Sequence, residues 1–348
     1  MSLRVATWNI EWFGNLFDGR SALRLDDDWS ARYKVTRAEQ GAAIARVLRR
    51  LDADLLLVVE APNTGKRQST VRALKNFAAA FGLRQSAAAI GFANDTHQEL
   101  AVMYDPDTLS LRHDPRGVPG DAARAVHAPR FDTQFRLDVD VDGQPDVHIF
   151  SKPPVEMEIR LAAGGKALRL IGVHTKSKAP HGAKNEAEEL AISIANRRKQ
   201  LAQCVWLRQR VEDHLRDGDD LIVLGDFNDG PGLDGYERLF GRSGVEVVLG
   251  MDAPEDRQLR EPHARIWLDP RQGWSLSTAR FYSKPYRRYL NALLDYVMLS
   301  PGLAERGAAA WRIWHPFDDP DCFDDDAMRL ALLAASDHFP VSVDLELP

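Results

Sequence analysis

Several apolar, strand-like runs of the sequence end in a side chain that can move a proton or bind a charged group. The run 221–224 leads into Gly225, Asp226 and Asn228, and in an extended segment residues two apart point the same way. A carboxylate beside an amide can deprotonate a water and donate a hydrogen bond to a phosphoryl oxygen. The structural alternative is an Asx turn that caps the next helix, for which residues 229–231 already supply turn chemistry.

Two other runs end in charged or titratable residues. The run 54–59 ends in Glu60, which taken alone fits a solvated strand end equally well. His174 ends another run and is followed by Lys176 and Lys178, and an imidazole beside ammonium groups is an anion-binding arrangement. A structural role is the more common one for a lone histidine at a strand end.

The C-terminal part of the chain holds a further acid and imidazole. Asp295 lies near the start of the expected strand 294–299, where its charge would be costly in a sheet core unless it is paired. Asp337 and His338 stand side by side before the last strand, and in a loop both can point at one spot. We expect His338 to be the partner of Asp295, which would orient the imidazole ring.

Short β-rich runs must position these side chains, because they occur throughout the sequence. The expected strands are 4–9, 54–60, 99–104, 135–141, 147–150, 155–161, 168–174, 220–226, 294–299 and 341–345. Apolar residues at three- and four-residue spacing predict a core-facing helix over 36–51 and a long surface helix over 186–215. We therefore expect sheets that pack against each other or under helices, and a purely parallel doubly wound sheet fits the pattern poorly.

Composition sets limits on the class of protein. With 348 residues, 44% hydrophobic and 28% charged, the chain can bury a large core, and its two cysteines are too few for a disulfide framework. We find no repeat, linker or composition shift, so a single domain over residues 1–348 is the simplest organisation. The net charge of -6 argues against coating nucleic acid by bulk electrostatics, although a local basic groove stays possible.

The apolar runs also bear on location. They are of strand length, far from the roughly 20 residues that cross a bilayer, so we expect no membrane association. The N-terminus lacks the cationic start and long apolar core of an export signal, which predicts a cytoplasmic protein, or a secreted one if a signal has been removed.

Six short motifs, in this order along nearly the whole chain, resemble the endonuclease/exonuclease/phosphatase superfamily, which includes the pancreatic deoxyribonucleases. They are Trp8-Asn9-Ile10-Glu11, Glu60, His174, Gly225-Asp226-Phe227-Asn228, Asp295-Tyr296 and Ser336-Asp337-His338-Phe339-Pro340. The segments 174–178 and 226–231 are most similar to the bacterial nuclease-like branch. The fold that this resemblance implies is of the α+β class, a four-layer α/β/β/α sandwich of two mixed β-sheets packed face to face with helices outside.

The resemblance also implies a divalent cation. It makes Glu60 the principal ligand, helped by Asn9 and by Asp337 directly or through water. Carboxylate and amide oxygens with retained waters suit Mg²⁺ or Mn²⁺ rather than zinc. Glu11 could add a carboxylate to the surroundings of the ion or form a surface salt bridge, and Glu99 could pair with His174.

Carried over position by position, the resemblance assigns the catalytic roles. Asp226 would align and deprotonate the attacking water, and Asn228 would hold a nonbridging phosphoryl oxygen. His338, oriented by Asp295, would contact the scissile phosphate, while His174 would bind the same phosphate from the opposite side. Such groups catalyse phosphoester hydrolysis mainly by alignment and charge neutralisation.

Local features bear on the substrate. The tract 280–289, with Arg287 and Arg288, interleaves cations with aromatic rings, which suits phosphates and unstacked bases unless the rings pack on the sheet. Lys176 and Lys178 are further candidates for substrate binding. The turn at Lys152 resembles a basic-Pro-Pro turn that usually has Arg, and Lys lacks the planar two-pronged contact with phosphate. The acidic run 318–326 would repel a polyanion near the cleft, and a solvated loop is its more common form.

The expected function is therefore that of a metal-dependent phosphodiesterase, a nuclease that hydrolyses nucleic acid by attack of an activated water. One alternative is a phosphatase of a small phosphorylated metabolite or lipid head group. The other is a binding module that keeps the fold without turnover. The expected partner is a nucleic acid substrate, no obligate protein partner is evident, and the oligomeric state is left open.

Overall fold

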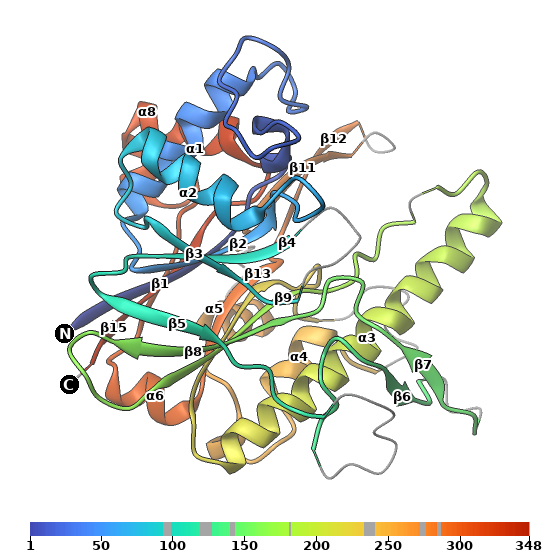
Figure 1. Cartoon of the computed structure of the whole chain (residues 1–348). Helices are drawn as coiled ribbons and strands as arrows, with labels where there is room; N and C mark the ends of the chain where they lie inside the picture. Colours follow the sequence, from blue (N-terminus) through green and yellow to red (C-terminus); the bar gives the residue numbers. More distant parts are fainter. Residues whose placement is uncertain are drawn as a thin grey trace.

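Two large mixed sheets form the centre of the molecule (Figure 1). The computed structural model describes residues 1–347 except 93–98, 119–126, 140–142, 181, 233–240, 270, 272–275 and 284–286. The first sheet has the order β14-β15-β1-β2-β4-β3, with β14 (Ala310–Ile313), β15 (Val341–Glu346), β1 (Ser2–Asn9), β2 (Leu55–Ala61), β4 (Glu99–Tyr104) and β3 (Ala87–Ile90). The second has the order β13-β10-β9-β8-β5, with β13 (Asp295–Leu299), β10 (Asp220–Asp226), β9 (Leu168–His174), β8 (Val155–Leu161) and β5 (Leu109–His113).

Helices cover the outer faces of both sheets (Figure 1). Helices α1 (Arg37–Leu51), α2 (Thr70–Phe81) and α8 (Asp326–Ala335) pack on the first sheet, and α3 (Glu186–Arg216) and α4 (Gly244–Leu249) pack on the second. The shorter helices are α5 (Pro262–Leu268), α6 (Pro301–Arg306), α7 (Pro320–Asp324), η1 (Phe13–Leu16) and η3 (Glu255–Arg257). Among the described residues, no helix is long and apolar enough to cross a bilayer.

Strand alternation divides the apolar residues into three buried layers. In β10, Leu221 and Val223 face the layer under α3, whereas Ile222 and Leu224 face the layer between the two sheets. A third layer lies between the first sheet and α1, α2 and α8, where Trp8 is fully buried. Three apolar layers need four layers of structure around them, so the predicted α/β/β/α sandwich is confirmed.

Parallel pairing brings the strand ends that matter to one edge of the sandwich. In the first sheet β1 pairs parallel with β2, and Asn9 lies opposite Val59, directly before Glu60. In the second sheet β10 pairs parallel with β9, and Asp226 lies opposite His174. Because parallel strands end at the same edge, the polar residues at these four ends come together.

Two small hairpins extend from this framework. The hairpin of β11 (Ala279–Ser283) and β12 (Arg288–Ala292) begins beside His338, since Ala279 forms a bridge with that residue. The second hairpin joins β6 (Phe135–Leu137) and β7 (Asp146–His148). The expected strand 135–141 is thus shorter than predicted, and its residues 140–141 lie outside the described ones.

The two predicted helices are confirmed, and the acidic run requires a correction. α1 and α3 end within one residue of the expected bounds. The segment 318–326 is helical for the most part, because the side chains of Asp319 and Asp325 cap the N-termini of α7 and α8. These acids satisfy orphan N–H groups and the positive end of each helix, which is a structural use of negative charge.

Candidate active site

Asp226 is placed by the backbone of the residue before it. Gly225 has φ +137°, and a Cβ at this position would collide with the carbonyl oxygen of Val173 on β9. Only glycine fits this close approach of two strands. The chain then delivers Asp226 at the end of β10, 1% exposed and opposite both His174 and Asp295.

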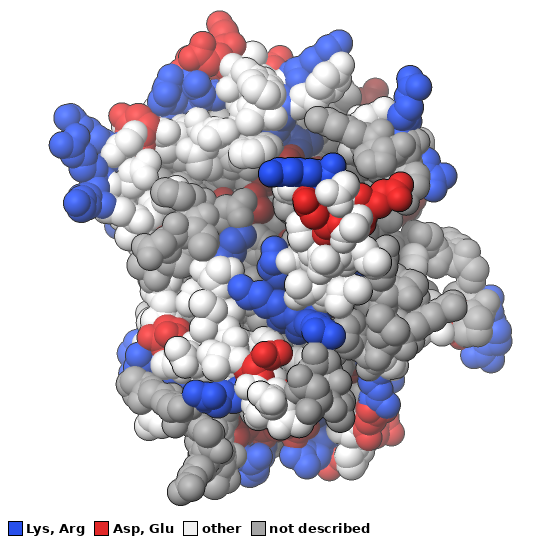
Figure 2. All heavy atoms as spheres, turned by 90° about the vertical axis from the view of Figure 1, so that its right-hand side faces the viewer, with Lys and Arg blue, Asp and Glu red and all other residues white. Residues whose placement is uncertain are grey.

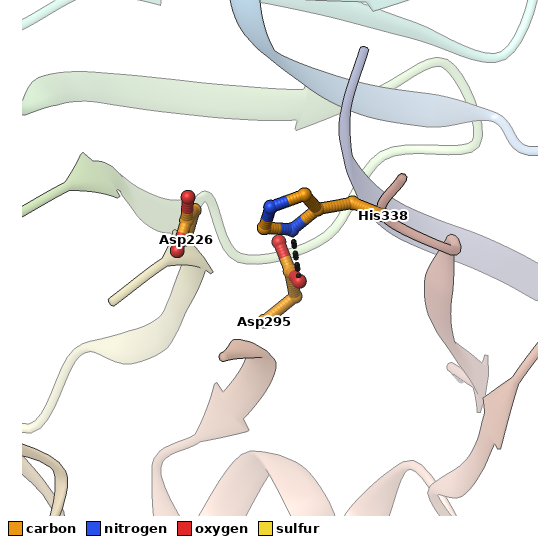
Figure 3. Close-up of side chains that lie close together, drawn as sticks. All are labelled: Asp226, Asp295 and His338. Atoms are coloured by element: carbon orange, nitrogen blue, oxygen red, sulfur yellow. Dashed lines mark hydrogen bonds and ion pairs between the residues drawn. The ribbon is translucent and has the colours of Figure 1, made fainter. Parts of the chain in front are cut away.

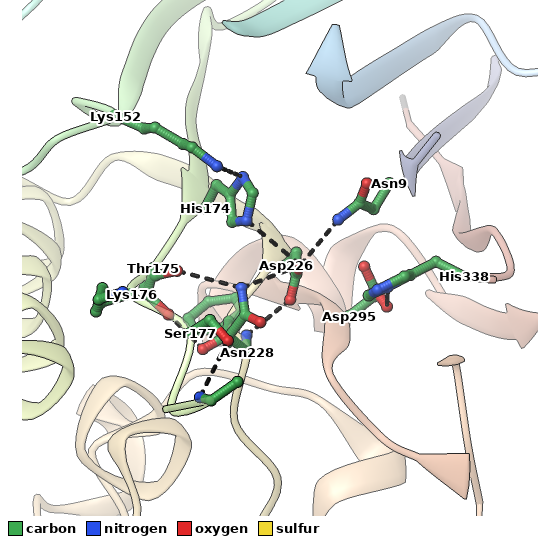
Figure 4. A network of polar contacts seen from close by, with 12 residues as sticks. Asn9, Lys152, His174, Thr175, Lys176, Ser177, Asp226, Asn228, Asp295 and His338 are labelled. Carbon is green, nitrogen blue, oxygen red and sulfur yellow. Dashed lines mark hydrogen bonds and ion pairs between the residues drawn. The ribbon is translucent and has the colours of Figure 1, made fainter. Parts of the chain in front are cut away.

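The Asp226 carboxylate is the centre of a polar network (Figure 4). It accepts hydrogen bonds from Asn9 Nδ2 at 3.0 Å, from the Asn228 backbone N at 2.7 Å and from Asn228 Nδ2 at 3.2 Å. Burial, and next the charge of Asp295, raise the pKa of Asp226 to about 6, against the effect of these hydrogen bonds. A carboxylate with a pKa near the working pH is suited to accept a proton.

Asn228 uses its amide group within the protein. Its Nδ2 donates to Thr175 O at 3.2 Å as well as to Asp226, so both amide hydrogens are engaged. Gln200 of α3 donates to the Asn228 carbonyl at 2.9 Å and holds the left-handed residue, φ +47°, in place. An N–H of Asn228 reaches a phosphoryl oxygen only by exchanging one of these bonds.

His338 and Asp295 form a buried pair, with the ring edge directed at Asp226 (Figure 3). The distance from His338 Nδ1 to Asp295 Oδ2 is 2.8 Å, and Thr278 Oγ1 donates to the same oxygen at 2.8 Å. Burial alone would lower the pKa of His338. The Asp295 charge and hydrogen bond, with Asp226 and Asp337, outweigh burial and raise it well above its usual value. His338 is therefore an imidazolium at neutral pH.

His174 is neutral, in contrast to the positively charged His338. Burial, and next the positive charges of Lys152 and His338, lower the pKa of His174 well below its usual value. Lys152 Nζ lies 3.1 Å from His174 Nδ1 and can only donate, so we assign the ring proton to Nε2. Nε2 lies 3.7 Å from Asp226 Oδ2, which leaves a neutral N–H donor directed into the site.

Glu60 stands at the edge of the same site. It has φ +61° at a β-bulge between Val59 and Ala61, which turns its side chain out of the regular pleat. Burial raises the pKa of Glu60 to about 7, and Asp226 and Asp337 add to this while Lys152 and His338 oppose it. Asp226 and Asp337 thus both repel the Glu60 carboxylate, and acids gathered in this way are the usual surroundings of a cation.

The donor atoms present fit the implied Mg²⁺ or Mn²⁺. The Asn9 Oδ1 atom is buried and has no hydrogen-bond partner among the described residues, so an acceptor is available beside Glu60. Oxygen donors from Asn9, Glu60 and Asp337 form a hard, anionic set. These three residues would hold the ion.

A second group, Asp226, Asp295 and His338, also has three possible ligand atoms within 4.8 Å of one another. His338 already shares its Nδ1 with Asp295, and the ring is positively charged, which opposes a cation at this point. The set of Asn9, Glu60 and Asp337 has no such positive ring and stays the predicted cation site.

The proposed substrate-binding residues are less closely grouped. Lys178 forms an ion pair with the buried Asp229, which itself accepts the Val245 N–H at the start of α4. Arg287 and Arg288 lie at the tip of the β11–β12 hairpin, the end farthest from His338. Lys284, Pro285 and Tyr286 of the same tract lie outside the described residues.

Two further acids have local partners. Glu11 forms an ion pair with Arg32, which agrees with the predicted salt bridge rather than with a role near the ion, although both side chains are largely covered. Glu99 is buried and accepts a hydrogen bond from Thr64 N at 3.3 Å, next to the segment that follows Glu60. The group that contacts His174 Nδ1 is Lys152.

Lys152 and Thr278 belong to this site although the sequence gives no sign of their roles. Lys152 was visible as part of a basic-Pro-Pro turn, but the turn gave no indication that its ammonium group reaches His174. Thr278, which binds Asp295 and accepts the backbone N–H groups of Leu294 and Asp295, carries no sequence signal beyond its type.

Several solved structures share this fold. An endonuclease/exonuclease/phosphatase family protein from Bacteroides thetaiotaomicron has a TM-score of 0.54 at 14% identity, over 100% of this chain and 96% of that one. TDP2 from D. rerio, complexed with a single-strand DNA product, has a TM-score of 0.51 at 12% identity, over 99% and 98%. A mannosyl-6-phosphatase from B. thetaiotaomicron has 0.50 at 14%, over 98% of both chains. At these identities the likeness establishes the fold.

The sequence itself identifies the family. No curated protein matches it significantly. The model of the Endonuclease/Exonuclease/phosphatase family, however, matches residues 6–338, from β1 to His338 near the C-terminus. The chain belongs to the endonuclease/exonuclease/phosphatase family, whose members are metal-dependent phosphoester hydrolases.

Proposed function

We propose that this protein is a divalent-metal-dependent phosphodiesterase that hydrolyses nucleic acid. The Asp226 carboxylate accepts a proton from the water that attacks phosphorus. The new P–O bond forms as the ester P–O bond breaks, and the leaving oxygen takes up a proton from solvent. Asp226 is held for this role by three hydrogen bonds from Asn9 and Asn228.

Positive charge and N–H donors stabilise the negative charge that develops on the phosphoryl oxygens. The His338 imidazolium is fixed by Asp295, and the neutral His174 ring directs its Nε2–H toward Asp226. The Lys152 ammonium group adds a charge behind His174. Such donors act strongly because burial excludes water from around them.

The implied Mg²⁺ or Mn²⁺ would be held by Glu60, Asn9 and Asp337. When bound, it supplies charge neutralisation at the phosphate and at the leaving oxygen. The raised pKa of Glu60, about 7, means that the ion and protons compete for this carboxylate near neutral pH.

The observation that favours a nucleic acid substrate is a series of lysines leading away from the catalytic centre. This lysine row consists of Lys152, Lys176 and Lys199. Burial lowers the pKa of Lys152, the charges of Glu60 and Asp226 oppose this, and the neighbouring Lys176 adds a smaller repulsion. Burial and the neighbouring Lys199 lower the pKa of Lys176.

The backbone fixes this row against α3. Gln203 Oε1 accepts the Lys176 N–H at 2.8 Å, and Gln200 donates to the Lys176 carbonyl at 2.9 Å, next to Lys199 in the helix. Figure 2, which faces the edge where the strands end, shows Lys and Arg side chains gathered across its middle. A single phosphate needs charge at one point, whereas successive phosphates of a strand need a row of charges.

The test measures three substrates with Mg²⁺, with Mn²⁺ and with EDTA: supercoiled plasmid, a single-strand oligonucleotide, and small phosphomonoesters. We expect metal-dependent cutting of nucleic acid that EDTA abolishes. The Asp226→Asn variant should retain its fold by circular dichroism and lose about 10²- to 10⁴-fold in rate.

The other outcomes separate the alternatives. Metal-dependent phosphate release from small esters without cutting of any nucleic acid would favour the phosphatase. An absence of turnover on every substrate would favour a binding module. An Asp226→Asn variant as active as the wild type would remove the proposed base.

A further inference from the structure

A cavity of about 650 Å³ lies directly beside Glu60 and outside the catalytic network described above. We propose that this cavity, the indole pocket, binds one unstacked nucleobase next to the scissile phosphate. The inference rests on the proposed nuclease function, which it makes more specific. The pocket is formed by Glu60–Asn63 at the end of β2 and by the segment between β1 and α1, which contributes Trp12 and Trp29.

Two indole side chains provide flat faces in this pocket. Trp12 is 47% exposed and has φ +61°, a backbone conformation that large L residues rarely adopt. Trp29 is 67% exposed, and its Nε1 donates to Arg32 O at 2.5 Å. Because that N–H is already bonded, the exposed part of Trp29 is aromatic surface. Exposed aromatic faces bind bases by stacking, independently of base identity.

The charges around the pocket balance, which favours a neutral ring over a phosphate. Arg37 pairs with Asp26 at 2.5 Å and with Asp28 at 3.0 Å, and Arg24 pairs with Asp26 at 3.3 Å. Asp18 and Glu60 add negative charge to the lining itself. An anion here would have to compete with these carboxylates for the guanidinium groups, whereas an uncharged base would not.

Hydrogen bonds hold the wall of the pocket to the body of the protein. Gln40 of α1 donates from Nε2 to Glu11 O at 2.8 Å and to Ala335 O at 2.9 Å. Arg32 pairs with Glu11 and donates to Leu333 O at 3.0 Å, which ties the Trp29 side of the segment to α8. A wall fixed in this way is preorganised, so little conformational entropy is lost when a ring enters.

The position of Glu60 links the pocket to the reaction. The same residue lines the pocket and interacts electrostatically with Lys152, Asp226 and His338. A phosphodiester at the catalytic centre therefore has the pocket on one side, within reach of the nucleoside attached to it. The lysine row begins at Lys152 and accounts for the neighbouring phosphates, which leaves the pocket for a base.

The experiment combines pocket variants with altered substrates. Single-strand oligonucleotides carry one cleavable phosphodiester among phosphorothioate linkages, with an intact or an abasic nucleotide on either side. Trp12→Ala and Trp29→Ala should each lower kcat/KM on the intact substrate about tenfold. Removing the base on one side should lower the wild-type kcat/KM by a similar factor. The variants should then lose nothing further on that abasic substrate.

The control is Tyr33→Ala, which removes an 80% exposed ring from the same segment outside the pocket lining and should leave both substrates unaffected. Trp12→Phe keeps an aromatic face and should restore most of the Trp12→Ala loss.

If Trp12→Ala and Trp29→Ala, folded by circular dichroism, cut the intact substrate like the wild type, the pocket does not bind a base. A loss that persists equally on abasic substrates at both sides points to a sugar contact and also overturns the inference. Failure of the wild type to cut any nucleic acid would instead overturn the proposed function.

Discussion

Two histidines of the same site carry different charges because different residues contact them. Asp295 makes His338 cationic, and Lys152 helps to keep His174 neutral. A protein that hydrolyses a phosphodiester gains from both, since a cation neutralises charge and a neutral ring donates without competing for the metal-binding carboxylates. Neither charge state follows from residue type, because the shift depends on neighbours distant in sequence.

Activity should decrease in acid as Asp226 takes up a proton. Its pKa is about 6, so the base is ionised above this pH and increasingly protonated below it. We expect kcat/KM to rise with pH through about 6 and to fall about tenfold per unit well below it. The measurement is a pH profile on an oligonucleotide at several saturating Mg²⁺ concentrations.

The metal series provides the control for this profile. Competition between protons and the ion at Glu60 moves with Mg²⁺ concentration, whereas titration of the Asp226 base does not. An acid limb that shifts to lower pH with every increase in Mg²⁺ would contradict the assignment to Asp226.

The same substitution should lower mainly kcat at Lys152 and mainly stability at Lys178. Lys152→Met removes the charge beside His174 and should lower kcat at least tenfold with a small effect on stability. Lys178→Met removes the cation that pairs with the fully buried Asp229 side chain and should lower the free energy of unfolding by about 3 kcal/mol. Urea unfolding and steady-state kinetics of both variants test this. Equal effects of the two substitutions on kcat and on stability would show that the two lysines do not have separate roles.

The acids and imidazoles of the candidate site could be proposed from the sequence because each stands at one end of an apolar strand. Glu60, His174 and Asp226 come at the end of one, whereas Asp295 and His338 come at or before the start of one. The roles of three other residues could not be predicted, because each contacts a residue of the candidate site from a segment distant in sequence. These residues are Lys152, Thr278 and Gln200. Asn228 shows a further limit. Its spacing from Asp226 predicts a shared direction, but its bond to Thr175 becomes visible only with β9 beside β10.

At the scale of elements, the end of β10 depends on one glycine. Gly225→Ala combines an unfavourable φ of +137° with a collision against Val173 O, so it should lower the free energy of unfolding by at least about 3 kcal/mol. The matched control is Gly19→Ala, because a Cβ at Gly19 has no neighbour within 4 Å and should change stability by at most about 0.5 kcal/mol. Urea midpoints of both variants measure the difference. A Gly225→Ala protein as stable as the Gly19→Ala protein would show that the two strands separate at little cost.

The elements differ in how well sequence predicts them. α1 was predictable because its buried residues recur on one stripe, with a capping box at Thr36. α8 was not, because its central residues 330–333 are all apolar and give no clear period. The sequence over β11 and β12 shows only a basic and aromatic tract, because the pairing of the two strands depends on the chain turning back beside His338.

At the scale of the whole molecule, the candidate site requires both sheets. Asn9 and Glu60 come from the first sheet, and His174, Asp226 and Asp295 come from the second. Face-to-face packing over one apolar layer places these ends next to each other, as the hydrogen bond between Asn9 and Asp226 shows. Sequence order alone does not specify this contact, and the resemblance to a known family was needed to predict it.

The lysine row makes a prediction about the salt dependence of binding. In the Asp226→Asn background, which prevents cutting, Lys176→Ala with Lys199→Ala should weaken binding of single-strand DNA at low salt. Each lost phosphate contact lowers the slope of log Kd against log salt by about 0.7, so the pair should lower it by about 1.4. The matched control, Lys75→Ala with Lys166→Ala, removes the same charge from α2 and from the turn before β9, at the opposite end of that strand from His174. Fluorescence anisotropy between low and moderate salt gives both slopes. If both pairs change the slope equally, binding follows net charge alone and the lysine row has no special part in it.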